Sequence, residues 1–342
     1  MRADQILDKL LNSAEPSIRW KARTQILGEE PHAPKLRALE EQVRRSARVR
    51  AILQRRNRLG RVGTLRGVYY KWQGIHWALA RLADLGYPPG DESLLPLRDR
   101  VLETWLGTVY YQERIADAAQ SGRRARKVGV PLIDGRYRRC ASQQGNALYS
   151  ITRLDLDDGR GKELVERLIH WQWPDGGWNC DVTPTADTSS FMETLVPMLG
   201  LAAFGAEGRS RMASQAARRA AEVFLRRGLF KRVSDGKTIR RAFVQLHYPV
   251  YYHYDILAGL RGMVEVDRIR DSRCGDALDL LESKRLPDGG WPAEATYYHY
   301  RPHQYSGQSE YVDWGGTSSV RMNPWITVDT LGVLHAAGRI SI

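Results

Sequence analysis

Three acidic residues, Glu193, Asp255 and Asp329, occupy equivalent places in three helical stretches, each two residues before a leucine. Carboxyl groups gathered in a partly enclosed space have raised pKa values, because burial and neighbouring negative charge both disfavour the ionised form. A carboxyl group with a pKa near neutrality can donate or accept a proton. We therefore take these residues as candidate catalytic groups, with His253 beside Asp255 as their partner.

The alignment behind this choice covers five helical stretches, which are superposed on Leu79, Leu148, Leu195, Leu257 and Leu331. Two residues before each leucine stand Trp77, Asn146, Glu193, Asp255 and Asp329. Six residues before each stand Gln73, Ser142, Ser189, Tyr251 and Trp325. Residues four apart lie on one helix face, so we expect both sets to line a common cavity.

Aromatic and polar side chains near this set complete the predicted binding surface. The π faces of Trp and Tyr can stabilise a cation. The candidate substrate-binding residues are Trp72, Gln73, His76, Trp77, Asn146, Asp187, Tyr251, Tyr254, His299 and Trp325. A structural interpretation stays open for each, since carboxylates in a first helical turn are favoured by the helix dipole and buried aromatic rings pack well anywhere.

The elements that must position these residues are almost all helical. Apolar spacing and Gly or Pro breaks predict helices over 3–12, 17–28, 35–57, 72–85, 94–110, 140–154, 161–172, 187–204, 209–227, 250–266, 273–285 and 324–337. Charged-faced helices alternate with helices richer in Gly, Ala and aromatic residues, which indicates an outer and an inner ring. We expect an all-α protein, an α/α toroid of about five to six helical hairpins over residues 35–342, with short helices in residues 1–34 packed on it.

A repeated turn relates two of these hairpins. Residues 174–178 and 287–291 both read Pro-Asp-Gly-Gly-Trp, each after an amphipathic helix. Pro ends the helix, Asp bonds its own backbone, the two Gly allow positive φ, and Trp buries a large ring. Two copies in the same context indicate an internal repeat.

At these turns the chain resembles the terpenoid cyclase and protein prenyltransferase (squalene cyclase-like) superfamily. Residues 172–178 fit its QxxDGGW (QW-like) repeat in full, and residues 285–291 fit it except that Arg285 replaces Gln. The resemblance covers roughly residues 60–338 and implies the α/α toroid. It implies no particular reaction, because in that superfamily the motif joins an outer helix to its neighbour and is structural.

Two further motifs are discounted. Residues 155–158 read Asp-Leu-Asp-Asp, like the proton-donating DxDD of terpene cyclases, but they precede an outer helix and we expect a helix-initiating turn. Cys180, Asp181 and His253 offer the residue types of the prenyltransferase zinc site at a different spacing. No DDxxD or CxxC motif occurs. We therefore expect no metal and no cofactor.

Charge and composition bear on partners. The net charge is +13, and Arg supplies most of the basic residues. A basic helix over 35–57 and a basic loop over 123–139 could bind nucleic acid, or the bias reflects genome composition alone. There is no apolar run of 18 residues and no signal peptide, so we expect a cytoplasmic protein without a transmembrane segment. The oligomeric state is left open.

The loop after the second turn is unusually long. Asp175 and Glu193 are 18 residues apart, whereas Asp288 and Asp329 are 41 apart. The additional length is rich in Tyr and His, including His299, and long loops in compact domains are often functional. We expect it to cover the mouth of the cavity.

These features favour an enzyme of the terpene cyclase-like kind that binds an apolar, isoprenoid-like molecule in a central cavity and uses carboxylate acid–base chemistry. One alternative is a toroid acting on an acidic sugar polymer, as polysaccharide lyases do, with Tyr and His moving protons and Arg binding carboxylates. The other is a non-catalytic scaffold for nucleic acid or protein.

Overall fold

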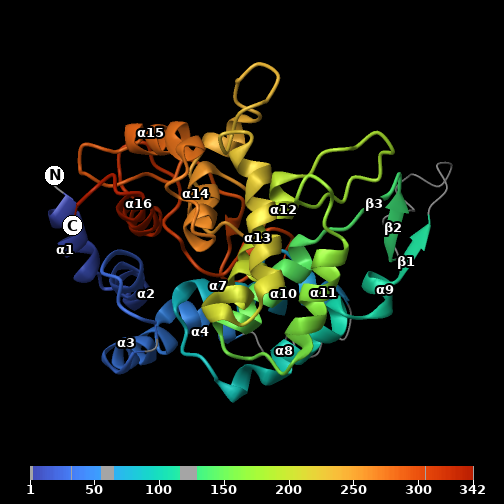
Figure 1. Ribbon diagram of the computed structural model, residues 1–342. Coiled ribbons are helices and arrows are strands. Elements are labelled where there is room, and N and C mark those ends of the chain that lie inside the picture. The colour runs from blue at the N-terminus through green and yellow to red at the C-terminus, as the bar shows by residue number, and fades with distance from the viewer. Residues whose placement is uncertain (1–2, 32, 55–64, 116–128, 305, 342) are drawn as a thin grey trace.

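The computed structural model describes residues 3–31, 33–54, 65–115, 129–304 and 306–341. The protein is mostly helical (Figure 1), which confirms the predicted all-α class. The N-terminal helices are α1 (Ala3–Leu11), α2 (Pro16–Lys21), η1 (Ala22–Ile26), α3 (Pro34–Arg44), α4 (Ala47–Leu53) and α6 (Leu65–Tyr69). The long helices that follow are α7 (Ile75–Leu85), α8 (Leu95–Trp105), α10 (Ser142–Arg153), α11 (Arg160–His170), α12 (Phe191–Gly205), α13 (Arg211–Leu225), α14 (Ile256–Glu265), α15 (Gly275–Ser283) and α16 (Pro324–Ala336). Short helical turns are η2 (Glu92–Leu94), α9 (Thr108–Tyr111), η4 (Ala206–Gly208), η5 (Arg241–Val244) and η6 (Ser272–Cys274).

Within the described residues, five short strands accompany the helices, where the sequence predicted only loops. Strand β1 (Glu113–Ile115) pairs in parallel with β2 (Val130–Ile133), and β2 pairs antiparallel with β3 (Arg136–Tyr137). Within the long loop, β4 (His299–Tyr300) pairs in parallel with β5 (Ser309–Glu310). Strands of two to four residues carry too little alternation to be recognised in a sequence.

The helices predicted as inner contact one another in chain order. Helix α7 packs on α10, α10 on α12, α12 on α14, and α14 on α16. Helix α16 then contacts α2 and η1, and α2 contacts α7. The segment before residue 35 therefore packs against both the first and the last of these helices. The two ends of the chain lie on one side of the molecule, beside α1 and α16 (Figure 1).

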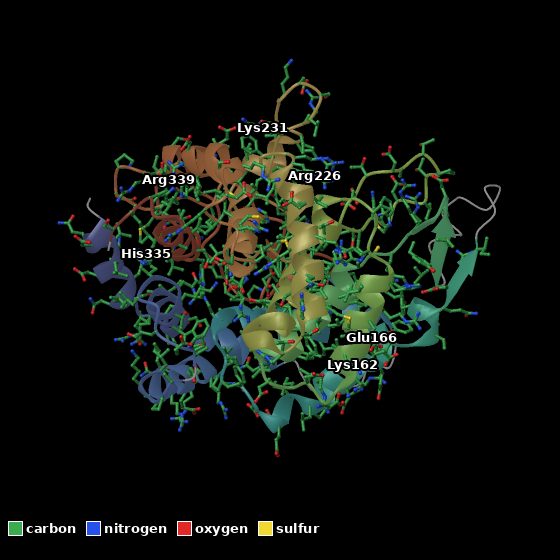
Figure 2. All side chains as sticks on the ribbon, in the orientation of Figure 1. Lys162, Glu166, Arg226, Lys231, His335 and Arg339 are labelled. Atoms are coloured by element: carbon green, nitrogen blue, oxygen red, sulfur yellow. The ribbon has the colours of Figure 1, made fainter. Side chains whose placement is uncertain are left out.

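The helices predicted as outer pack on this first set. Helix α8 contacts α7 and α10, α11 contacts α10 and α12, and α13 contacts α12 and α14. Helix α15 contacts α14. Lys162 and Glu166 of α11 point to the outside of the molecule (Figure 2), and they form an ion pair one turn apart. The charged face of α11 is thus solvated while Leu164 and Leu168 are buried, as the amphipathic pattern predicts.

Polar N-caps set several helix boundaries. Asn323 accepts bonds from the amides of Trp325 and Ile326, with Pro324 at the first position of α16. Asp255 accepts from the amide of Ala258, so α14 begins only at residue 256. Ser46 caps α4 and divides the predicted helix 35–57 in two. Residues 55–57 of that prediction, and 123–128 of the predicted basic loop, lie outside the described residues.

The two repeated turns make matching bonds. The indole N–H of Trp178 donates to Leu168 O of the preceding outer helix, and that of Trp291 donates to Leu281 O. The amide of Trp178 donates to Thr194 Oγ1 on the next inner helix. The amide of Trp291 does the same to Thr327 Oγ1. The repeat is therefore a physical one, a bridge between an outer helix and the inner helix that follows it.

The aspartates of the two turns are equivalent as well. Asp175 accepts from the amide and hydroxyl of Ser189, and Asp288 accepts from the amide of Met322. Gly176 has φ +107° and its Cα faces the carbonyl oxygen of Arg219, so only a residue without Cβ fits there. The turn is part of the scaffold.

The Asp-Leu-Asp-Asp stretch starts α11. Asp157 accepts from the amides of Gly159 and Gly161, and Asp158 pairs with Arg160. The carboxylates of Asp157 and Asp158 accept bonds from backbone amides of residues 159–161 at the start of α11, as expected of a helix-initiating turn. Among the helices of the described chain, none has the length and apolar character needed to cross a membrane.

Candidate functional site

A cavity of about 100 Å³ lies between four of the inner helices. Helices α7, α10, α12 and α14 form its walls, together with the segment 248–251 that precedes α14. The lining residues are Ala80, Arg81, Asp84, Asn146, Tyr149, Leu195, Val196, Leu199, Tyr248, Pro249, Val250, Tyr251, Ala258, Arg261 and Glu265. Of the predicted site residues, this lining includes Asn146 and Tyr251.

The cavity has an apolar part and a charged part. Leu195, Val196 and Leu199 of α12 form an apolar wall, and Val250 adds to it. The charged residues come from α7 and α14, and Tyr149, Tyr248 and Tyr251 also line the cavity. A cavity of this composition suits a ligand with an apolar body and one polar end.

Four charged residues form a closed network beside the cavity. Lys21 Nζ lies 2.9 Å from Asp84 Oδ1 and 3.2 Å from Asp329 Oδ1. Arg261 reaches the same two carboxylates, with Nη2 3.1 Å from Asp84 Oδ1 and Nη1 2.9 Å from Asp329 Oδ2. Two cations therefore each bridge two anions. The Lys21 side chain is 0% exposed, so this tetrad links α2, α7, α14 and α16 in the interior.

The tetrad holds Asp84 ionised. Burial opposes the ionisation of Asp84, but Lys21 and Arg261 outweigh burial and lower its pKa. Tyr248 Oη donates to Asp84 Oδ2 over 2.7 Å. Burial raises the pKa of Tyr248, so the phenol keeps its proton. Asp84 consequently serves as a fixed anion and hydrogen-bond acceptor.

A second buried ion pair brings the long loop to the cavity. Both carboxylate oxygens of Glu310 lie 2.5 Å from Arg81 Nη1. Tyr251 Oη also donates to Glu310, as do the amides of Tyr311 and Val312. Glu310 belongs to β5 and is 0% exposed, which makes it the inner anchor of the loop.

Aromatic rings stack where this loop meets α7. The rings of Trp72 and Tyr251 are parallel, with centroids 4.0 Å apart. Trp77 meets Trp72 edge-on at 5.0 Å, and its indole N–H donates to the carbonyl of Tyr69. Lys71 Nζ lies 4.4 Å from the Tyr252 ring centroid. The cation that faces the Tyr252 ring is therefore the Lys71 side chain of the protein itself.

The three candidate carboxylates occupy three different environments. Glu193 accepts from the amide of Ser142 and lies 3.6 Å from Cys180 Sγ, and burial raises its pKa. Asp255 caps α14 and lies 2.9 Å from His247 Nδ1. Asp329 belongs to the tetrad. Neither Glu193, Asp255 nor Asp329 is in the cavity lining, so the predicted ring of carboxylates does not form there.

The chain before α14 shows why Tyr251 and Asp255 do not share a helix face as predicted. The alignment placed Tyr251 one helical turn before Asp255, but residues 248–255 are not helical and Tyr251 has φ +50°. Tyr251 enters the cavity from this irregular segment, and Asp255 turns to the amides of His247 and Ala258. Equal spacing along the chain did not place these residues on one face.

His76 is buried and hydrogen-bonded on both ring nitrogens. The indole N–H of Trp105 lies 3.1 Å from Nδ1 and can only donate, so Nε2 carries the proton. The amide of Asn146 lies 3.1 Å from Nε2, and its oxygen must then face the ring. Burial lowers the pKa of His76 to about 3. His76 therefore positions Asn146 at the cavity as a neutral group.

His253 is part of an aromatic cluster. Its ring stacks on Tyr297 at 3.8 Å and on Tyr252 at 4.5 Å. Burial, followed by His247 and Lys71, lowers its pKa to about 3. A histidine that stays neutral and packed in this way orders the loop.

The remaining predicted residues have structural contacts or are exposed. Gln73 donates to Gln304 O in the long loop. Tyr254 donates to Leu229 O and packs between Phe191 and Phe224. Trp325 stacks on Tyr248 at 5.0 Å. Asp187 and His299 are exposed.

Sequence reasoning missed five charged residues at the centre of the molecule: Lys21, Arg81, Asp84, Arg261 and Glu310. One feature of the sequence could have identified three of these residues, Lys21, Asp84 and Arg261. Lys21 follows Ile18 by three positions, Asp84 follows Ala80 by four, and Arg261 follows Leu257 by four. Each is thus a charge on the apolar side of its helix, where an unpaired charge would be costly.

No known protein-family model matches this chain, and a search of curated proteins finds no significant relative.

Proposed function

We propose that this protein is an α/α toroid of the terpenoid cyclase-like kind that binds a small, mainly apolar molecule carrying an uncharged polar group. The observation that carries the proposal is the cavity between the inner helices, whose lining combines an apolar wall with a balanced set of charges.

The order of helix contacts supports the toroid. Contacts run from α7 through α10, α12, α14 and α16 to α2, and α2 contacts α7 again. The outer helices α8, α11, α13 and α15 each pack on one or two of these. A closed ring with a second ring around it is the simplest arrangement that has these contacts.

Charge balance supports an uncharged ligand. At the cavity, Arg81 pairs with Glu310 and Arg261 pairs with Asp84. Glu265, which also lines the cavity, lies 2.6 Å from Arg153. Each lining cation therefore has its own carboxylate. A ligand anion would have to compete with these partners, whereas a hydroxyl can donate to or accept from groups in place.

Size limits the ligand further. A cavity of about 100 Å³ is of the same order as the apolar cavity of about 150 Å³ that is known to hold benzene in an engineered protein, and it is partly open to solvent. A triterpene would extend beyond this space. The part of an isoprenoid-like ligand that the cavity encloses is thus about the size of a single ring.

The described cavity supports recognition better than acid catalysis. A proton-initiated cyclisation needs a neutral carboxyl group facing the substrate. Asp84 is held ionised, and Glu310 is surrounded by donors. An acidic sugar polymer is disfavoured by the balanced charges. The nucleic-acid alternative is weakened because Arg44, Arg45 and Arg48 of the basic stretch pair with nearby carboxylates.

Thermal shift measurements with matched ligands test the proposal. Cyclohexanol should raise the melting temperature, and cyclohexanecarboxylate, which has the same ring and a charge, should not. Ala80→Phe, which fills the cavity, should abolish the cyclohexanol shift, while Ala213→Ser on outer helix α13 should retain it. Stabilisation by the carboxylate or by oligogalacturonate in preference to the alcohol would contradict the proposal.

A further inference from the structure

A second group of chemically capable side chains lies outside the cavity lining. Cys140, Cys180 and Glu193 each place one ligand atom within 4.8 Å of the other two. Among the described residues this is the one such group of three or more His, Cys, Asp or Glu side chains. All three side chains are half-buried, so the group is packed yet open to small ions from solvent.

Three separate parts of the fold bring these residues together. Cys140 stands just before α10, and Cys180 follows the first Asp-Gly-Gly-Trp turn by two residues. Glu193 is in the first turn of α12. The turn is fixed to α12 by the bond from the Trp178 amide to Thr194 Oγ1, next to Glu193 in sequence. The scaffold therefore determines the spacing of the group.

The distances suit a tetrahedral metal ion. Cys180 Sγ lies 3.6 Å from Glu193 Oε1. Ligand atoms bound at about 2.0–2.3 Å around tetrahedral zinc are about 3.5–3.8 Å apart. The other oxygen, Oε2, accepts from the amide of Ser142 over 3.1 Å. That bond orients the carboxylate with Oε1 toward the thiols, as bonds to metal-ligating carboxylates commonly do.

A buried cation beside the group is the second, independent observation. Arg139 is buried, and its side-chain bonds go to the neutral amides of Gln144, at 3.2 Å, and Gln143, at 2.7 Å. A buried charge bonded to neutral groups is unfavourable unless a counter-charge lies near. Arg139 directly precedes the proposed ligand Cys140 in the chain. Negative charge on the group of Cys140, Cys180 and Glu193 would therefore stabilise the buried Arg139.

We propose that Cys140, Cys180 and Glu193 bind one Zn²⁺ ion, with a fourth position left for water. Two thiolates, one carboxylate and Zn²⁺ carry a net charge of −1, which Arg139 balances. Thiolate ligands favour zinc over magnesium or calcium, and a site with three protein ligands keeps an open coordination position. The site shares Cys180 with the discounted set of Cys180, Asp181 and His253, but His253 packs in the aromatic cluster.

Zinc titration of the full-length, reduced, metal-free protein tests the proposal. Calorimetry should give one site per chain. Cys140→Ser and Cys180→Ser should each weaken binding at least 100-fold, and Glu193→Gln at least tenfold. Cys274→Ser is the matched control, because Cys274 is buried elsewhere and donates to Arg268 O. It should bind zinc as the unchanged protein does.

Cobalt binding gives an absorption signal that requires metal–thiolate bonds. Cysteines with a purely structural role would not produce this signal. Bound Co²⁺ should show thiolate-to-cobalt charge-transfer absorption, retained in Cys274→Ser and lost in Cys140→Ser. If a serine variant fails to fold, judged by circular dichroism, Glu193→Gln decides, since it keeps both thiols.

Two results would overturn the zinc site. One is stoichiometric zinc binding that survives both Cys140→Ser and Cys180→Ser with unchanged affinity. The other is no zinc binding by the reduced protein together with a Cys140–Cys180 disulfide in the air-oxidised protein, seen as a mass lower by two hydrogens.

Discussion

Glu310, from the long loop, places both carboxylate oxygens 2.5 Å from Nη1 of Arg81 on α7. The two residues are 229 positions apart and both are buried. We expect the long loop to cover the cavity mouth. Glu310 attaches this loop to Arg81 and Tyr251, which both line the cavity, so the expectation can be tested by breaking the Arg81–Glu310 ion pair.

Glu310→Gln should loosen the loop. The change removes the counter-charge of a buried arginine, and breaking such a pair costs about 3–5 kcal/mol. Limited proteolysis should then cut within residues 299–308 faster than in the unchanged protein. Asp313→Asn is the control, since it removes the same charge from an exposed position of the same loop. Equal cleavage of the two variants would argue against the anchor.

Lys21→Met should destabilise the protein by about 3 kcal/mol or more, because Asp84 and Asp329 then share a single cation. The free energy of unfolding from denaturant titration measures this. In a double-mutant cycle, Lys21→Met with Asp84→Leu should cost less than the sum of the two single changes. The control is Arg45→Met, because Arg45 is exposed where it pairs with Glu41, and the expected effect is under about 0.5 kcal/mol. Strict additivity would mean that the two residues do not interact.

Gly176→Ala should be far more damaging than Gly236→Ala. Both glycines have positive φ, +107° and +69°, so both changes carry a backbone cost of about 1 kcal/mol. A Cβ at Gly176 would lie 2.2 Å from Arg219 O, while one at Gly236 would meet nothing within 4 Å. Thermal unfolding of the two variants compares them. Similar melting temperatures would show that the turn can relax away from α13.

Stability should fall as the pH drops below about 6.5, in part because of His76. Its pKa is about 3 in the folded protein, so between these values the unfolded chain binds a proton that the folded chain does not. The contribution of neutral His76 to the free energy of unfolding is fully present above pH 6.5 and is lost as the pH falls toward 3.

His76→Gln should therefore reduce the slope of unfolding free energy against pH by up to about 1.4 kcal/mol per unit between pH 6 and 4. Denaturant titrations at several pH values give this slope. His299→Gln, at an exposed position, should leave it unchanged. An unaltered slope in the His76 variant would place the acid sensitivity elsewhere.

The helices could be predicted well from the sequence because their signals are local. Helix 324–337 was predicted and α16 spans Pro324–Ala336, and helix 140–154 corresponds to α10 at Ser142–Arg153. Asn323 and Pro324 mark a start that needs no tertiary information. The repeated turn was also predictable as scaffold, since Pro, Asp, Gly and Trp act through their own backbone bonds and burial.

The candidate site could be predicted only in part. Asn146 and Tyr251 do line the cavity, but the partners of Asp329 and Asp255 decide what those carboxylates do. Lys21 comes from α2, and His247 lies at the start of the irregular stretch that precedes α14. No spacing rule relates residues 308 positions apart such as Lys21 and Asp329. Their pairing gives these predicted catalytic carboxylates structural contacts instead.

The tetrad sums to zero charge, so the net charge of +13 is carried by the rest of the protein. Ionic strength screens exposed charges over about 8–10 Å of water, and it acts weakly on pairs inside the protein. Added salt should therefore weaken the ion pairs at the surface without opening the helix contacts around Lys21. The charge interactions of the surface and those of the interior can thus be varied independently in this molecule.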